Sequence, residues 1–304
     1  MLCRNDIALL TVLSMSIAAG VLFPNLGRPL QPYIQFCVMF LLFLSFLSIK
    51  VGEIWEIFIQ SWLQIAWLTF LKLLLLPVLI YLAFKWIWPS FALGAMLLAG
   101  ISTGAVAPFI SNLVGAHTPL VLALTIITTL LVPFSLPGLV ELLVGRNMEI
   151  PLLDMIRLLA EVIFIPVLAG ELLRRISPKL TDGLKSCGFS LSLICFSLIG
   201  LAVFSRYTTF FYQQPEFVAA ALGIAVVLGG IFMSIGLLLF WRSGLARQLG
   251  AAIALGNINN ILIIVFSAQF FGPLESTLAA FYMFSFFGLI VPLRIFRHWR
   301  ENAE

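Results

Sequence analysis

The sequence predicts an all-α membrane protein with ten transmembrane helices in two inverted five-helix repeats. Three observations lead to this fold class: the composition, the succession of apolar segments, and two glycine-rich interruptions half a chain apart. Of the 304 residues, 62% are hydrophobic and only 10% are charged, whereas a soluble domain has about 25% charged residues. Because so little polar surface cannot cover a globule in water, we expect a lipid bilayer around the chain.

Ten apolar segments follow one another, each near the roughly 20 residues that a bilayer-spanning helix needs. Prolines and glycines separate them. The first segment is interpreted as a retained helix and not as a cleaved signal peptide, because nine more apolar segments follow it. The expected segments are 7–24, 33–49, 57–84, 90–114, 118–143, 151–173, 186–204, 216–240, 247–270 and 274–294.

The basic residues between the segments predict the orientation in the membrane. With ten helices both termini lie on one side, and that side has the larger share of lysine and arginine, which is typical of the cytoplasm. We therefore expect a multi-pass protein of the plasma or inner membrane with cytoplasmic termini. The basic residues form no continuous stripe, so the net charge of +4 does not indicate nucleic-acid binding. The favoured side has Arg4, Lys50, Arg174, Arg175, Lys179, Lys185, Arg242, Arg247, Arg294, Arg297 and Arg300, against Arg28, Lys85, Arg146 and Arg206 on the other.

Two apolar segments contain small and polar residues at matching places in the two halves of the chain. The fourth reads GISTGAVAP at 100–108, and the ninth reads GNINN at 256–260. The prolines that follow, Pro119 and Pro273, are 154 residues apart. Inverted repeats with one interrupted helix each are typical of secondary transporters, whose broken helices expose backbone groups to ions and anions. The alternative is that small residues only let helices pack closely.

These stretches, in this order, resemble the bile acid:sodium symporter family. The run LFPNLGRPLQPY at 22–33 is similar to the first connection of that family, and 103–108 with 125–133 resembles its fourth and fifth helices. The resemblance spans nearly the whole chain and implies crossed, broken helices 4 and 9. It also implies a panel domain (about 1–50 and 151–204) and a core domain (about 57–143 and 216–294). The substrates it implies are organic anions carried with sodium.

The chain departs from the family pattern where that pattern binds sodium. An ungapped alignment places the usual serine–asparagine pair on Ala107 and Pro108, and the usual glutamate on Ala254, so most side-chain ligands are lost. Where the family pattern has a glutamine in the third helix, this chain has Lys72. We expect no resident cofactor, and we expect degenerate sodium sites.

Lys72 is the most unusual residue in the sequence. It lies roughly 15 Å along the apolar stretch 62–82 if that stretch is helical. A charge at such depth faces the interior of the bundle and indicates a functional site. An ammonium carries one positive charge and three donors, so Lys72 could replace a bound cation or release a proton. The alternative is a structural pair with Glu161 or another acidic residue, which would hold helices together.

The remaining candidates are polar side chains in the two interrupted segments and in their neighbours. We predict that Thr103, Gly104, Asn257, Asn259 and Asn260 bind substrate, because buried amides are costly unless they bond to something. Thr125 and Glu161 are candidates for coupling, beside Lys72. Thr125 could equally bond a carbonyl of its own helix, and Glu161 could pair with Arg157.

The function predicted from these features is secondary active transport of a small organic anion by alternating access. Transport would be sodium-independent or proton-coupled, with Lys72 in place of a sodium ion. A channel or facilitator is the first alternative, because polar broken helices can also line a pore. A membrane enzyme is less favoured, since the sequence shows no HExxH motif and has only two histidines. The oligomeric state does not follow from the sequence.

Overall fold

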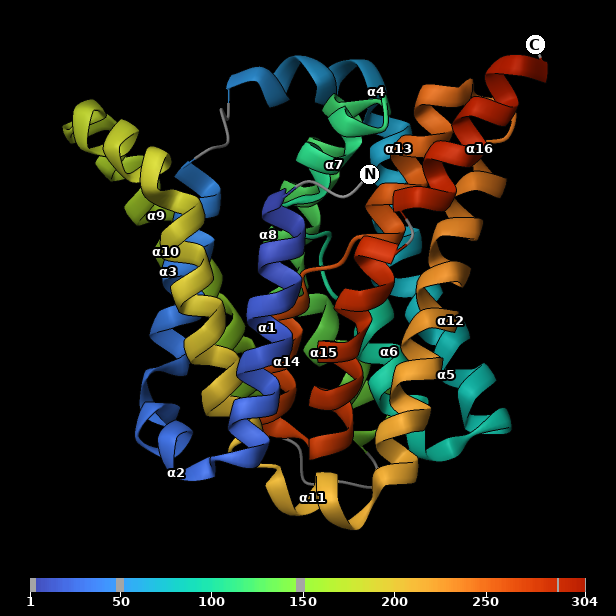
Figure 1. Ribbon diagram of the computed structural model, residues 1–304. Coiled ribbons are helices and arrows are strands. Elements are labelled where there is room, and N and C mark those ends of the chain that lie inside the picture. The colour runs from blue at the N-terminus through green and yellow to red at the C-terminus, as the bar shows by residue number, and fades with distance from the viewer. Residues whose placement is uncertain (1–3, 48–51, 146–150, 289, 304) are drawn as a thin grey trace.

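The protein is helical throughout the part of the chain that the structure describes. The computed structural model describes residues 4–47, 52–145, 151–288 and 290–303. Within these ranges every regular element is a helix, and the one β-contact is an isolated antiparallel bridge between Thr103 and Ile258. Most of the long helices run side by side as a bundle (Figure 1).

Six helical stretches among the described residues are long and apolar enough to cross a membrane. They are 24–30 residues long, and two shorter apolar helices, at Pro89–Gly100 and Asn260–Phe270, accompany them. These stretches confirm a multi-pass membrane protein. The six are Pro24–Leu47, Ser61–Ile87, Thr118–Leu143, Pro178–Phe204, Pro215–Leu239 and Pro273–Asn302.

The first half of the chain ends with an interrupted helix and a long helix. Its elements are α1 (Arg4–Leu22), α2 (Pro24–Gly27), η1 (Arg28–Tyr33), α3 (Ile34–Leu47), α4 (Gly52–Phe70), η2 (Leu71–Leu75), α5 (Leu76–Ile87), η3 (Pro89–Phe91), α6 (Ala92–Gly100), α7 (Ala107–Leu113) and α8 (Thr118–Leu143). The turn η2 is a π-helical segment that joins α4 to α5. Such π-bulges inside α-helices are frequent at functional sites.

The second half contains the other interrupted helix. Its elements are α9 (Leu152–Ile176), α10 (Pro178–Phe204), α11 (Thr208–Gln213), α12 (Pro215–Leu239), α13 (Leu245–Gly256), α14 (Asn260–Phe270), α15 (Pro273–Gly288) and α16 (Ile290–Ala303). The interruption lies between α13 and α14, and the corresponding one in the first half lies between α6 and α7.

Several predicted boundaries differ from the observed ones. The helix expected at 186–204 begins at Pro178, because proline fits the first helical turn and the polar first turns continue outside the apolar part. The helix expected to end at 294 continues as α16 to Ala303. The connection at 24–33 forms short helical turns. The end of the second predicted segment, with Lys50, and Arg146 lie outside the described residues.

The helices pack in two groups. In one group α1 and α3 contact α10, and α3 also contacts α9. In the other, α12 packs against α13 and α15, α14 packs against α15, and α5 packs against α6. Figure 1 shows α3, α9 and α10 on one side of the bundle and α5, α6 and α12 on the other. Helix α8 contacts both α4 and α9.

Candidate functional site

The two interrupted helices meet inside the bundle. We call the residues that join α6 to α7 (101–106) and α13 to α14 (257–259) the crossing. Here the two extended segments form the isolated antiparallel bridge between Thr103 and Ile258. Both of these residues are buried, with exposed fractions of 0% and 3%. The two halves of the chain are therefore joined at their matching interruptions.

Backbone hydrogen bonds across the crossing replace those that the interruptions remove. The Gly104 N–H donates to the Asn257 carbonyl at 2.8 Å, and the Asn259 N–H donates to the Ser102 carbonyl at 3.0 Å. Inside a membrane an unpaired backbone group costs several kcal/mol, so irregular backbone survives there only where protein or a polar cavity satisfies it. Each interruption therefore depends on the other.

Gly104 is required by the closeness of the two segments. A Cβ atom at this position would lie 2.6 Å from the Asn257 Oδ1 and 2.7 Å from the Ile258 carbonyl oxygen. The second atom belongs to the backbone and cannot turn away. The absence of a side chain at Gly104 thus permits both cross-segment hydrogen bonds.

Thr103 connects the crossing to two further helices. Its Oγ1 donates to the Ala254 carbonyl of α13 at 2.8 Å. Its backbone N–H donates to the Thr128 Oγ1 of α8 at 3.0 Å, and this hydroxyl donates in turn to the Leu124 carbonyl at 2.6 Å. The side-chain hydroxyl and the backbone N–H of Thr103 thus both form hydrogen bonds within the protein. Thr103 therefore holds the crossing together.

Lys72 caps the C-terminal end of α13. Its side chain is 1% exposed, and its Nζ donates to the Leu255 carbonyl at 3.0 Å. Since α13 ends at Gly256, its last carbonyls have no helical N–H partner and carry a partial negative charge. An ammonium is the complementary group at such an end. The ammonium therefore lies inside the bundle, at the last carbonyls of α13.

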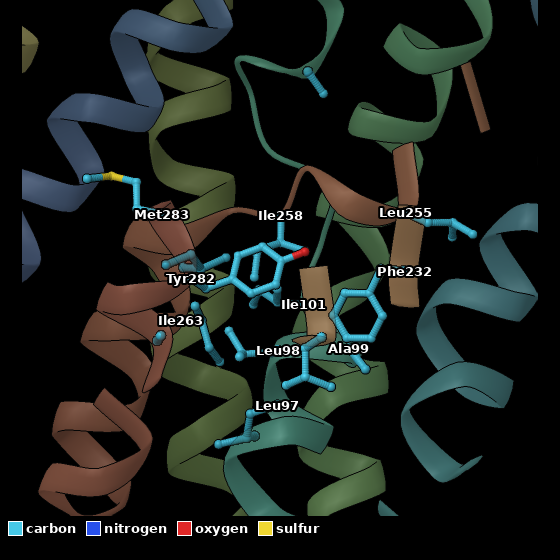
Figure 2. Packing of buried hydrophobic residues seen from close by; sticks show 14 of the residues in the cluster. Leu97, Leu98, Ala99, Ile101, Phe232, Leu255, Ile258, Ile263, Tyr282 and Met283 are labelled. Atoms are coloured by element: carbon cyan, nitrogen blue, oxygen red, sulfur yellow. The ribbon is translucent and has the colours of Figure 1, made fainter. Parts of the chain in front are cut away.

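Tyr282 of α15 satisfies the neighbouring carbonyl. Its hydroxyl donates to the Gly256 carbonyl at 2.6 Å, and the side chain is fully buried. Figure 2 shows its ring beside Ile258, above the buried side chains of Leu98 and Ile101. Sequence reasoning did not identify Tyr282, because one tyrosine in an apolar segment looks like any other buried aromatic residue. Two successive carbonyls at the end of α13 are therefore capped by side chains from other helices.

The three asparagines have different environments. Asn259 caps α14, since its Oδ1 accepts from the Leu262 N–H at 3.4 Å. By contrast, the Asn257 Oδ1 and both polar atoms of the Asn260 amide are buried without a partner, as is the Ser102 Oγ. A buried polar atom without a hydrogen bond costs about 1–3 kcal/mol. The Asn257 Oδ1 and the whole Asn260 amide thus have hydrogen-bonding capacity that the described residues do not use.

Among the described residues, neither Thr125 nor Glu161 forms a hydrogen bond or ion pair with the Lys72 ammonium. The Thr125 Oγ1 donates to the Val121 carbonyl of its own helix at 2.9 Å. Glu161 accepts from the Arg157 Nε at 2.8 Å, and its side chain is 39% exposed. The alternative pair between Lys72 and Glu161 is not formed, because the i,i+4 neighbour of Glu161 lies within reach on the same helix face.

Comparison with known proteins gives one match to a protein family. The model of the Sodium Bile acid symporter family matches residues 35–214, which is more than half of the chain. This range contains α6, α7 and α8 but not α13 and α14. No curated protein matches the sequence.

Proposed function

The chain belongs to the sodium bile acid symporter family, and from this premise we propose that it is a secondary active transporter of an organic anion. Members of this family are membrane transporters and not enzymes. The proposal adds three parts: a topology, a substrate site and a replacement for the coupling ion. The contact between Lys72 and the end of α13 carries it.

The proposed topology has ten membrane crossings in two inverted halves. Besides the six long apolar helices, it assigns crossings to α1, to α9 and to the two interrupted pairs. Support comes from the bridge between Thr103 and Ile258, because corresponding interruptions of two inverted repeats meet near the midplane. The positively charged connections favour cytoplasmic termini.

Two packing groups suggest how alternating access works. We assign α1, α3, α9 and α10 to a panel domain, and α4–α8 with α12–α15 to a core domain. The panel helices contact one another extensively, and so do most of the core helices. Rocking of one group against the other would expose the crossing first to one side of the membrane and then to the other.

The proposed substrate site consists of the unpartnered polar groups at the crossing. Asn260 supplies a buried amide whose nitrogen and oxygen both have no partner among the described residues, and Asn257 supplies a buried Oδ1 without one. Because an amide nitrogen donates two hydrogen bonds, the Asn260 side chain suits a carboxylate or sulfonate oxygen, while the Asn257 Oδ1 can accept from a donor on the substrate. Thr103, Gly104 and Asn259 then support the site through the backbone and helix-cap contacts described above.

Lys72 is proposed to replace a sodium ion. Sodium prefers several oxygen ligands, yet Ala107, Pro108 and Ala254 offer no side-chain oxygen. One carbonyl at the end of α13 is already bonded to Lys72, and another to Tyr282. The ammonium thus supplies one positive charge beside the anion site without a bound ion. If the charge stays fixed, the protein is a facilitator or exchanger; if Lys72 releases its proton during the cycle, uptake follows the proton gradient.

The experiment that tests this function is uptake by proteoliposomes from a panel of labelled organic acids. We expect saturable uptake of at least one acid, with exchange when the unlabelled acid is inside. Asn257→Leu and Asn260→Leu should raise the KM or abolish uptake of that acid. The matched control is Asn302→Leu, which makes the same change at the exposed end of α16 and should leave uptake unaltered. Single-channel conductance, or unchanged uptake by both crossing variants, would contradict the proposal.

A further inference from the structure

Arginines and tryptophans, most of them exposed, gather where α12, α13 and α16 meet. The Arg300 guanidinium lies over the Trp241 ring, 4.6 Å from its centroid. The Phe296 ring connects Trp241 to Trp299, with centroid separations of 6.4 Å and 6.2 Å. We define the basic–aromatic patch as Trp241, Arg242, Arg247, Trp299 and Arg300. Figure 1 shows α13 and α16 at the end of the bundle that holds the C-terminus.

Two arginines of this patch have no acidic partner among the described residues. The arginines at 157, 174, 175 and 297 each pair with a glutamate three or four positions away. Arg242 and Arg247 are exposed and form no such ion pair within the described part of the chain. The stretch 217–274 contains no aspartate or glutamate at all. The charges of Arg242 and Arg247 are therefore not neutralised by an acidic side chain of the described residues.

The lengths of the neighbouring helices indicate that the patch lies at the level of the lipid headgroups. The apolar stretch of α12 ends at Leu239, two residues before the patch begins. The stretch Pro273–Asn302 has 30 residues, so it is about 45 Å long and exceeds the roughly 30 Å hydrocarbon core. Its C-terminal part, α16, must then reach the interface. Trp241 and Trp299 are 44% and 59% exposed, as is usual for aromatic residues at that depth.

The same elements hold the tip of the hairpin formed by α7 and α8. The His117 N–H donates to the Ala246 carbonyl of α13 at 2.8 Å. The Arg297 Nη1 of α16 donates to the Val114 carbonyl at 3.0 Å. Because α7 and α13 both lead into the crossing, a ligand that joins the turn after α12 to α16 also fixes the outer ends of both interrupted helices.

We propose that the basic–aromatic patch binds the phosphate headgroup of an anionic phospholipid of the surrounding bilayer. Two guanidinium forks without acidic partners match phosphate oxygens, and guanidinium is the group that recognises phosphate bidentately. The flanking tryptophans contact the glycerol and the upper acyl chains. An occupied patch holds α13, α16 and the hairpin tip together, so the bound lipid stabilises the core of the transporter.

The test uses the purified full-length protein in a neutral detergent and needs no transported substrate. Short-chain phosphatidylglycerol or phosphatidylcholine is titrated, and retained lipid is counted by native mass spectrometry. We expect phosphatidylglycerol to bind and to raise the unfolding midpoint. Arg242→Gln with Arg247→Gln should weaken this binding about 30-fold, because each arginine near a membrane surface contributes about 1 kcal/mol and 1.4 kcal/mol is tenfold.

A matched control changes charge by the same amount elsewhere. Arg157→Gln with Arg175→Gln removes two arginines whose side chains are 78% and 76% exposed, on α9. This pair should leave phosphatidylglycerol binding unchanged. Equal losses in both double variants would overturn the proposal, because they would indicate only an effect of net charge. Equal retention of phosphatidylcholine, or equally tight binding of inorganic phosphate, would also overturn the assignment to an anionic lipid.

Discussion

Gly104→Ala tests whether the two interruptions depend on each other. The new methyl group would lie 2.7 Å from the Ile258 carbonyl oxygen, so the two segments must separate. We expect the hydrogen bonds from Gly104 to Asn257 and from Asn259 to Ser102 to lengthen or break together.

The size of this effect follows from the contacts. Overpacking costs about 1–3 kcal/mol, and two lost hydrogen bonds add about 1 kcal/mol each. The total is about 3–5 kcal/mol. At about 2 °C per kcal/mol for a chain of this size, the unfolding midpoint should fall by about 6–10 °C.

Thermal unfolding in detergent, followed by tryptophan fluorescence, measures this change. Gly223→Ala is the matched control, because a Cβ atom at that position of α12 meets no atom within 4 Å. The control should keep its midpoint or gain slightly, since alanine favours helix over glycine by up to about 1 kcal/mol. If Gly104→Ala unfolds at the same temperature as the control, the close approach at the crossing is not what holds the two segments.

Two further substitutions test neighbouring contacts. Thr128→Val leaves the Thr103 N–H without its 3.0 Å acceptor and should lower the free energy of unfolding by about 1–3 kcal/mol. In the control Thr129→Val, the lost hydroxyl donates to a carbonyl of its own helix, so the free energy of unfolding should fall less. Equal losses of stability in the two variants would refute the link between Thr103 and α8. Burial, together with the charge of Arg247, lowers the pKa of His117 in the folded protein. As the pH falls below about 6.5, the histidine is therefore protonated in the unfolded chain before it is protonated in the folded one, and the free energy of unfolding should decrease. His117→Asn keeps a helix-capping side chain but cannot titrate, and its midpoint should therefore change less between neutral and acidic pH; an unchanged pH profile would contradict this role.

The sequence predicted where the two helices are interrupted better than it predicted the hydrogen bonds that form there. Glycines and asparagines at matching positions located the crossing, because an interrupted helix needs small residues and polar groups that few other elements need. Lys72 stood out by its depth in an apolar stretch. That depth also predicted that Lys72 faces the interior of the bundle, because a charge is costly in lipid.

Other features could not be obtained from the residue pattern. The partner of Lys72 is the backbone carbonyl of Leu255. Because every residue has a backbone carbonyl, the sequence does not indicate which one the ammonium binds. Asn259 and Asn260 are adjacent and chemically identical, yet one caps α14 and the other has no partner. Which of them a ligand can use depends on where α14 begins, and that boundary becomes known only from the fold.

Helix ends explain the remaining differences. Glu161 bonds to Arg157, four residues earlier on the same helix face, which is the alternative that the sequence left open beside a role in coupling. The extensions of α10 to Pro178 and of α16 to Ala303 continue beyond the apolar segments. Hydropathy shows where a helix meets lipid, and it does not show where the helical backbone ends.

The sodium dependence of uptake tests the central claim most directly. The measurement compares uptake of an identified substrate into proteoliposomes in sodium with uptake after sodium is replaced by potassium or choline. Since the Lys72 ammonium already lies at the end of α13, we predict equal uptake in all three media, and loss of uptake in Lys72→Gln that still folds. Strict dependence on sodium in the native protein, or unaltered sodium-independent uptake by Lys72→Gln, would contradict the claim that this lysine takes the place of a bound cation.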